Sequence, residues 1–325
     1  MNRRNAVRLL MFAPNTLAGE IPCTAKIVGL PLNLGNLSIP VFQNGFLGVI
    51  ESDRTTIKLV DLSGRLISTT RIEVPGASVA FIVTLAISQM GGIVAAVSAK
   101  DDAGRLASLL VFINPGGAIN RIVRLDRFGV GGIDFLSDGT ILCVGREYDD
   151  EFKEVPGHEI LRFYSSVGSF LRKALRVDLL RPERKAAHPL NWLMRVNQSR
   201  IALVDKAGLR YCELDHSGAI LRLPEAIPAF EGTVRLNGFA LTNDGDRVVS
   251  VEAGEAINKA VSFGRTTSVY RFGGPVNSIH RRTKLDESTS PEWVRGSMVL
   301  GADRTNLVLM LFPPQAIAIY PQTIC

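Results

Sequence analysis

Four carboxylates occupy the same place in a repeated pattern, at the point where an apolar segment ends: Glu51, Glu147, Asp205 and Glu252. If these segments lie around one axis, their carboxylates form a ring of oxygen ligands, which is the kind of site that calcium prefers. Such a metal would polarise a substrate carbonyl. The alternative is that each carboxylate accepts backbone N–H groups of its own loop, since a residue repeated once per unit usually has a structural task in each unit.

A second group of reactive or ligand-binding side chains lies in or beside three long polar segments, 146–159, 178–191 and 252–267. Long loops on a rigid scaffold are where binding sites usually occur. These segments predict a surface for a protein or a small ligand. Its candidate residues are Arg146, Glu147, His158, Arg184, His188, Asn191 and Trp192, together with Arg295 from another blade.

No catalytic motif accompanies these residues. The sequence has no G-x-S-x-G, no H-E-x-x-H, no G-x-x-x-x-G-K-[ST] and no G-x-G-x-x-G. The four cysteines, Cys23, Cys143, Cys212 and Cys325, form no C-x-x-C pair, which argues against a zinc ribbon or a thioredoxin-like motif. Cys143 and Cys212 stand within apolar patterns and are expected to be free, buried thiols.

The elements that position these residues come from a repeat. Gly45, Gly92 and Gly139 follow one another at intervals of 47 residues, and Ser199 and Gly245 continue the series after 60 and 46. Each copy contains four short apolar or alternating segments separated by turn residues. Four antiparallel strands at such a period are typical of a propeller blade. The expected blades cover residues 39–72, 83–125, 132–177, 192–223, 238–285 and 295–325.

The last copy lacks its fourth strand, and residues 20–30 form a strand with no other place in the pattern. We therefore expect an all-β, six-bladed β-propeller over 20–325 whose last blade is closed by the N-terminal strand, which removes an open edge. Residues 1–19 would be a separate segment, with features of a truncated signal. This closure brings Cys23 near Cys325, as a disulfide if the protein is exported or as two free thiols if not.

The copy at 44–66, NGFLGVIESDRTTIKLVDLSGRL, resembles an NHL repeat. The shared features are Gly before an apolar strand, a carboxylate at its end, an alternating strand and the Asp-Leu-Ser-Gly turn. The resemblance implies the superfamily of six-bladed propellers that includes NHL-type and TolB-like members. Because that superfamily contains scaffolds, RNA binders, lactonases and lyases, the resemblance implies a fold and not an activity.

Charge does not point to nucleic acid. The net charge is +6, but much of the basic excess lies in the expected outermost strands, for example Arg121 and Arg124, where it discourages edge-to-edge aggregation. The uncharged stretch 74–99 contains Pro75 and the Gly91-Gly92 pair and predicts a buried hairpin rather than a membrane span.

The sequence favours a non-catalytic binding or scaffold propeller that presents its long loops on one face. A calcium-dependent lactonase or hydrolase that uses the four carboxylates is the first alternative. An RNA-binding propeller that uses Arg184 and Lys185 is the second. The sequence leaves a cytoplasmic and an exported location open.

Overall fold

The computed structural model describes residues 26–30, 39–180, 192–205, 210–226, 233–242, 245, 247–257, 260–272, 296–303, 305–312 and 316–321. Within these ranges the chain is built from strands, with one short helix, α1 (Val177–Leu180). None of the described helices is long and apolar enough to cross a membrane. The prediction of an all-β chain is therefore confirmed for the described residues.

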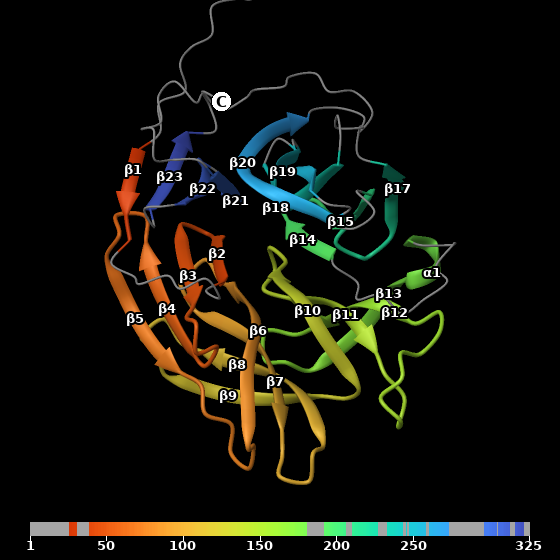
Figure 1. Cartoon of the computed structure of the whole chain (residues 1–325). Helices are drawn as coiled ribbons and strands as arrows, with labels where there is room; N and C mark the ends of the chain where they lie inside the picture. Colours follow the sequence, from red (N-terminus) through yellow and green to blue (C-terminus); the bar gives the residue numbers. More distant parts are fainter. Residues whose placement is uncertain are drawn as a thin grey trace, which may run out of the picture.

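The strands form antiparallel sheets in which neighbours along the chain are usually neighbours in space (Figure 1). Blade 1 contains β2 (Ile39–Gln43), β3 (Phe46–Ile50), β4 (Thr56–Asp61) and β5 (Leu66–Arg71). Blade 2 contains β6 (Val79–Ile87), β7 (Ile93–Lys100), β8 (Leu106–Ile113) and β9 (Ile119–Leu125). Blade 3 contains β10 (Phe128–Phe135), β11 (Ile141–Glu147), β12 (Glu159–Tyr164) and β13 (Phe170–Arg176).

The second half of the chain continues the pattern. Blade 4 contains β14 (Trp192–Val196), β15 (Ile201–Asp205), β16 (Arg210–Leu214) and β17 (Ile220–Ala226). A sheet with three described strands follows: β18 (Thr233–Leu241), β19 (Arg247–Ile257) and β20 (Ala260–Phe272). The closing blade contains β21 (Gly296–Ala302), β22 (Asn306–Phe312), β23 (Ala316–Pro321) and β1 (Lys26–Gly29).

The fold is thus an all-β propeller of four-stranded antiparallel blades, as predicted, with five complete blades. The fourth strand expected after β20 falls in residues 273–295, outside the described residues. The first strands of the sheets contact one another in series: β6 contacts β2 and β10, β14 contacts β10 and β18, and β21 contacts β18 and β2.

The closing blade joins the two ends of the described chain. Its outermost strand β1 pairs antiparallel with β23, with Lys26 opposite Ile319 and Gly29 opposite Ala316. The prediction that residues 20–30 complete the last blade is confirmed for the residues described there. Cys23 and Cys325, the pair expected as either a disulfide or two free thiols, lie outside the described residues.

The core consists of apolar layers between neighbouring sheets. One cluster joins blades 1 and 2 through Leu59 and Leu85, and another joins blades 3 and 4 through Phe163 and Leu203. The middle strands are buried on both faces, which explains why β3 and β7 are nearly continuously apolar. Cys143 and Cys212 belong to these layers as free, buried thiols, as predicted.

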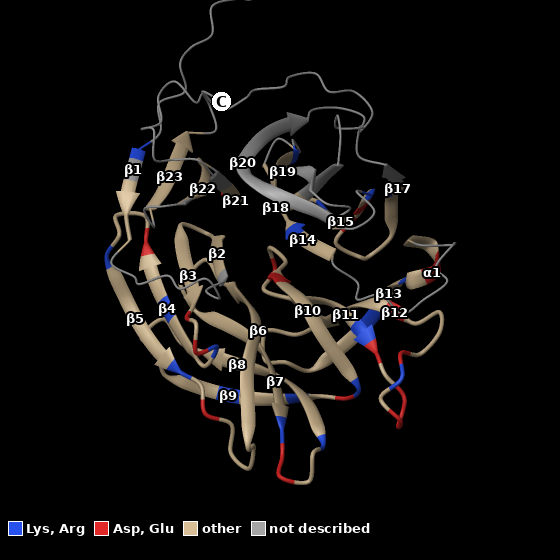
Figure 2. Cartoon of the chain, viewed as in Figure 1, with Lys and Arg blue, Asp and Glu red and all other residues tan. Residues whose placement is uncertain are grey.

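The outermost strands carry the exposed residues. Strand β9 is largely exposed and contains Arg121 and Arg124, so basic residues line this edge of blade 2 as predicted (Figure 2). The uncharged stretch 74–99 forms part of the β6–β7 hairpin, in which Ile87 is opposite Ile93. Its lack of charge therefore reflects burial between blades.

Aspartates of the Asp-Leu-Ser-Gly type cap the turns between the third and fourth strands. Asp61 Oδ1 accepts the N–H groups of Ser63 (2.9 Å) and Arg65 (3.0 Å). Asp215 Oδ1 accepts those of Ser217 (2.8 Å) and Ala219 (2.9 Å) in the same way. The motif behind the NHL resemblance is therefore turn chemistry, which supports a fold without specifying an activity.

Candidate ligand-binding site

The connections between blade strands emerge on two opposite faces. We call the loop face the side on which first strands begin and second strands end; it carries residues 148–158 of blade 3. The turn face carries the short turns between first and second strands. The loop face has a cavity of about 270 Å³ between blades 2 and 3, which we call the interblade cavity.

The side chains that line the interblade cavity come from three blades. Phe81 on β6, Tyr148 after β11 and Trp192 at the start of β14 supply aromatic rings. Ser98 and Ser108, which are opposite each other on β7 and β8, supply two hydroxyl groups. Arg146 near the end of β11 supplies a guanidinium group. The structure therefore brings together two of the predicted site residues, Arg146 and Trp192.

Bulges in the first strands open this cavity. The pairing of β6 with β7 shifts register between Ile82 and Thr84, and that of β10 with β11 shifts between Val130 and Gly132. The extra residues at these bulges, Val83 and Gly131, line the cavity. A Cβ atom built on Gly131 would meet only the Val144 carbonyl oxygen, at 3.7 Å. The bulge at Gly131 therefore leaves space open in the cavity wall.

Arg146 keeps hydrogen-bond donors available. Its Nη1 atom lies 3.8 Å from Glu154 Oε2, which is an ion pair but too long for a hydrogen bond. Its side chain is 20% exposed. No hydrogen bond of the guanidinium to another described residue accompanies this contact.

Arg54 supports the cavity wall at Phe81, and Trp192 is part of the wall. The Arg54 guanidinium carbon lies 5.2 Å from the centre of the Phe81 ring, and Arg54 Nη2 donates to the Ile82 carbonyl at 3.1 Å. Arg54 has φ 57°, a conformation that non-glycine residues rarely adopt. Trp192 is 5% exposed, and its buried Nε1 has no hydrogen-bond partner among the residues that the structure describes.

Two members of the predicted carboxylate ring, Glu51 and Glu147, have described side chains, and both form ion pairs with basic side chains. Glu51 Oε1 lies 2.6 Å from Lys58 Nζ on the adjacent strand β4. Glu147 Oε2 lies 3.3 Å from Arg162 Nη2 and 3.4 Å from Lys173 Nζ, on β12 and β13. Each carboxylate therefore pairs with cations of its own blade.

The side chains of Asp205 and Glu252 lie outside the described residues. Among the side chains that are described, no three His, Cys, Asp or Glu groups come close enough to hold a metal. The predicted calcium site remains a prediction, and any cation there would have to compete with these ion pairs.

His158 holds the long loop of blade 3. Its imidazole is fully buried, with Nδ1 at 2.7 Å from the Val155 carbonyl and 3.9 Å from Glu154 Oε1. Donation to the carbonyl requires a proton on Nδ1. His158 does not line the interblade cavity. The other predicted ligand residues, Arg184, His188, Asn191 and Arg295, lie outside the described residues.

A buried polar belt across the first strands is not apparent from the sequence. Gln43 Nε2 donates to Asp134 Oδ1 at 2.8 Å, while Gln43 Oε1 accepts the Ile87 N–H at 2.6 Å and so fixes the amide orientation. Burial raises the pKa of Asp134 to about 7, against the opposing effects of the Arg195 charge and of N–H groups that it accepts. Such residues had no sequence signal, since each stands singly at the end of an apolar strand.

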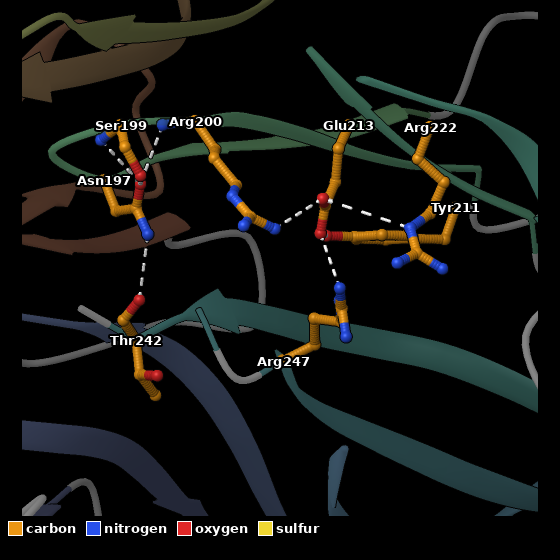
Figure 3. A network of polar contacts seen from close by, with 8 residues as sticks. All are labelled: Asn197, Ser199, Arg200, Tyr211, Glu213, Arg222, Thr242 and Arg247. Atoms are coloured by element: carbon orange, nitrogen blue, oxygen red, sulfur yellow. Dashed lines mark hydrogen bonds and ion pairs between the residues drawn. The ribbon is translucent and has the colours of Figure 1, made fainter. Parts of the chain in front are cut away.

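A buried ionic cluster between blade 4 and the three-stranded sheet was also missed (Figure 3). Glu213 is 2% exposed and accepts hydrogen bonds from Arg247 Nη2 (2.6 Å), Arg200 Nη1 (2.8 Å) and the Tyr211 hydroxyl. Burial raises the pKa of Glu213, but the hydrogen bonds from Tyr211 and Arg247 and the nearby arginine charges outweigh it and hold the pKa below its usual value. This cluster joins two sheets.

The turn face has a larger cavity, of about 850 Å³. Its polar lining residues are engaged in hydrogen bonds: Asn44 Nδ2 donates to the Ile87 carbonyl of blade 2, and Asn197 Nδ2 donates to the Thr242 carbonyl of the three-stranded sheet. Asp138 and Asp303 accept backbone N–H groups of Thr140 and Thr305. Loop length alone gave no reason to expect a cavity on this face.

No family model matches the chain, and no curated protein resembles it in sequence. The fold is similar to that of a candidate exported protein of Bacteroides fragilis, at 12% identity and a TM-score of 0.58, over 93% of this chain and 95% of that one. A gluconolactonase of Xanthomonas campestris (11% identity, TM-score 0.49, 91% and 89% covered) and the virginiamycin B lyase of Staphylococcus aureus (12%, 0.44, 92% and 99%) are also similar. At these identities the likeness concerns the fold alone, and the class that fold and topology define is the β-propeller.

Proposed function

We propose that the protein is a non-catalytic binding propeller that takes a small ligand in the interblade cavity. The observation that carries the proposal is the convergence of Phe81, Tyr148 and Trp192, from three blades, with the Arg146 guanidinium on one cavity of the loop face. Ligand sites are usually mostly apolar concavities with a few polar groups that fix orientation. At about 270 Å³ the cavity suits a small molecule or a single anchoring side chain of a protein partner.

The interblade cavity is favoured over the larger turn-face cavity because of how the polar groups are used. Asn44 and Asn197 already donate to carbonyls of neighbouring sheets, and Asp138 and Asp303 already accept N–H groups of their own turns. Arg146 has a single long ion pair, which leaves it able to bind a ligand. Binding is favoured over metal-assisted hydrolysis because a metal at Glu51 or Glu147 would displace Lys58, or Arg162 and Lys173.

We also propose that the propeller has six blades and belongs with the NHL-type and TolB-like propellers. Support comes from the contacts of β18 with β14 and β21, which give the three-stranded sheet the position of a blade. A fourth strand is expected within residues 277–284. Hydrogen exchange should then find slowly exchanging amides in 277–284; exchange there at the rate of an open chain would overturn this part of the proposal.

The binding function can be tested with a variant that fills the cavity. Tryptophan occurs twice in the chain, so Trp293→Phe leaves Trp192 as the only tryptophan, whose emission is excited selectively over that of tyrosine. In this background, small neutral, anionic and cationic fragments are screened by Trp192 emission. The screen is repeated with Gly131→Val, which adds bulk to the cavity, and with Gly29→Val as the control, since a Cβ at Gly29 meets nothing within 4 Å.

We expect that fragments which change the emission in the parent also do so in Gly29→Val and fail to do so in Gly131→Val. Matching melting temperatures of the two valine variants exclude an effect on folding. The proposal is abandoned if no fragment changes the emission, or if the same fragments act equally on Gly131→Val. The RNA-binding alternative depends on Arg184 and Lys185, outside the described residues, and we do not favour it.

A further inference from the structure

The charge of the interblade cavity is set by one residue. Among its described lining residues Arg146 is the only one with a full charge, and none is a carboxylate. Glu154, whose Oε2 lies 3.8 Å from Arg146 Nη1, does not line the cavity. Because the Arg146 side chain is mostly buried, its charge acts through a medium less polarisable than water, which strengthens its attraction for an anion.

The shape of the site favours a flat ligand body. Phe81, Tyr148 and Trp192 present aromatic surface from three blades. The Phe81 ring is held from outside by Arg54, and Tyr148 packs so closely on β10 that a Cβ at Gly129 would lie 2.9 Å from its ring. Aromatic rings pack best against planar partners in stacked or edge-to-face arrangements.

We infer that the ligand of the interblade cavity is a planar aromatic molecule that carries one carboxylate. The Arg146 guanidinium binds the carboxylate through two parallel N–H donors, a geometry that suits this group. The aromatic walls hold the ring, and the Ser98 and Ser108 hydroxyls face the same space. This inference rests on the proposed function and adds the chemical class of the ligand.

The turn-face cavity, on the opposite side of the propeller, is lined by acidic instead of basic side chains. The described lining of the turn-face cavity contains Asp138 and Asp303 and no Lys or Arg. An anionic ligand would be disfavoured there, since carboxylates repel it and no cation compensates. The two cavities therefore favour ligands of opposite charge. Binding of an anionic probe would indicate the interblade cavity on the loop face.

Three probes of the same shape test the inference: 2-naphthoate, 2-naphthamide and 2-naphthylmethylamine. Their dissociation constants are measured by ligand-observed NMR with the wild-type chain, Arg146→Gln and Arg146→Lys. We expect the dissociation constant of 2-naphthoate for the wild type to be lower than that of 2-naphthamide by a factor of about ten or more. The amine should bind most weakly. Arg146→Gln should abolish the preference for the acid, whereas Arg146→Lys should keep part of it because the positive charge remains.

The outcomes separate the inference from the proposed function. Equal binding of the acid and the amide to the wild type, or an acid preference that survives Arg146→Gln, overturns the ligand class but leaves a binding cavity. Failure of all three probes to bind the wild type also overturns the ligand class, and the fragment screen then decides the function. If Arg146→Gln does not fold, the wild-type ratio of acid to amide and the Arg146→Lys result decide alone.

Discussion

Glu213 shows how much one buried residue can contribute to the stability of this fold. Its carboxylate is 2% exposed and accepts hydrogen bonds from two arginines and a tyrosine, of which Arg247 and Tyr211 are also buried. Removing one partner of such a buried pair leaves an uncompensated charge. The effect of substituting such a residue on the free energy of unfolding can therefore be predicted directly.

Glu213→Gln should lower the free energy of unfolding by about 3–5 kcal/mol, because Arg247 stays buried without its counter-charge. Denaturant unfolding measures the change. Glu73→Gln is the matched control: Glu73 pairs with Arg71 at 3.7 Å, but its side chain is 82% exposed, so no measurable change is expected. Equal effects of the two substitutions would contradict this account of the cluster.

The raised pKa of Asp134 predicts that the free energy of unfolding depends on pH. Burial raises its pKa in the folded state to about 7, above the ordinary value of about 3.9 in the unfolded chain. Its favourable contribution is complete below the unfolded pKa and is lost as the pH rises through the folded pKa, since the folded state binds the extra proton. Asp134→Asn removes the ionisation, so the difference in the free energy of unfolding between wild type and variant should change between pH 4 and pH 7.

The measurement is urea unfolding at several pH values in that window. Relative to Asp134→Asn, the wild type should lose stability as the pH increases. A difference that is constant over the window, or one with the opposite slope, would show that the N–H donors of Phe135 and Val196 and the Arg195 charge outweigh burial.

At the scale of elements, the strands follow from local pattern and turn chemistry. Alternating or continuous apolar segments between turns with Gly and Asp are enough to place β3, β4 and β5, and the absence of a fourth strand in the last copy predicts β1. The register of the repeat is less well determined. Gly45 and Gly139 have positive φ, but in the corresponding turn of blade 2, between β6 and β7, Gly91 has positive φ and Gly92 does not.

The candidate site was predictable only in part, for a physical reason. Arg146 and Trp192 could be placed on the loop face because they stand at strand ends. The cavity itself depends on bulges at Val83 and Gly131, which have no distinctive sequence pattern. The pairing of Glu147 with Arg162 and Lys173 depends on cross-strand neighbours, so the carboxylate looked available in the sequence although its blade neutralises it.

The strand β1 is expected to contribute to stability as part of the closing blade. Val28 is buried in the layer between the closing blade and blade 1. Val28→Asp should lower the free energy of unfolding by about 2 kcal/mol or more, because it buries an unpaired charge. Lys26→Glu changes an exposed side chain of the same strand and serves as the control in thermal unfolding. Two variants as stable as the wild type would mean that the strand is dispensable.

At the scale of the whole molecule, a metal at the centre would require carboxylates of different blades to converge. Glu51 and Glu147 instead bind cations within their own blades. Millimolar calcium should therefore leave the melting temperature unchanged, and EDTA should do the same. A rise of several degrees with calcium that is absent in Glu51→Gln would restore the metal-dependent hydrolase as the better hypothesis.

The pairing of β1 with β23 also sets the order in which the protein can be completed during synthesis. Between Gly29 and Ala316 the ribosome must add roughly 290 residues, which takes about 15–60 s at ordinary elongation rates. During this time β1 has no partner strand, while the earlier blades are able to form as they emerge. The ring therefore closes only after translation of the last strand, and a chaperone that shields β1 would have to release it at that moment.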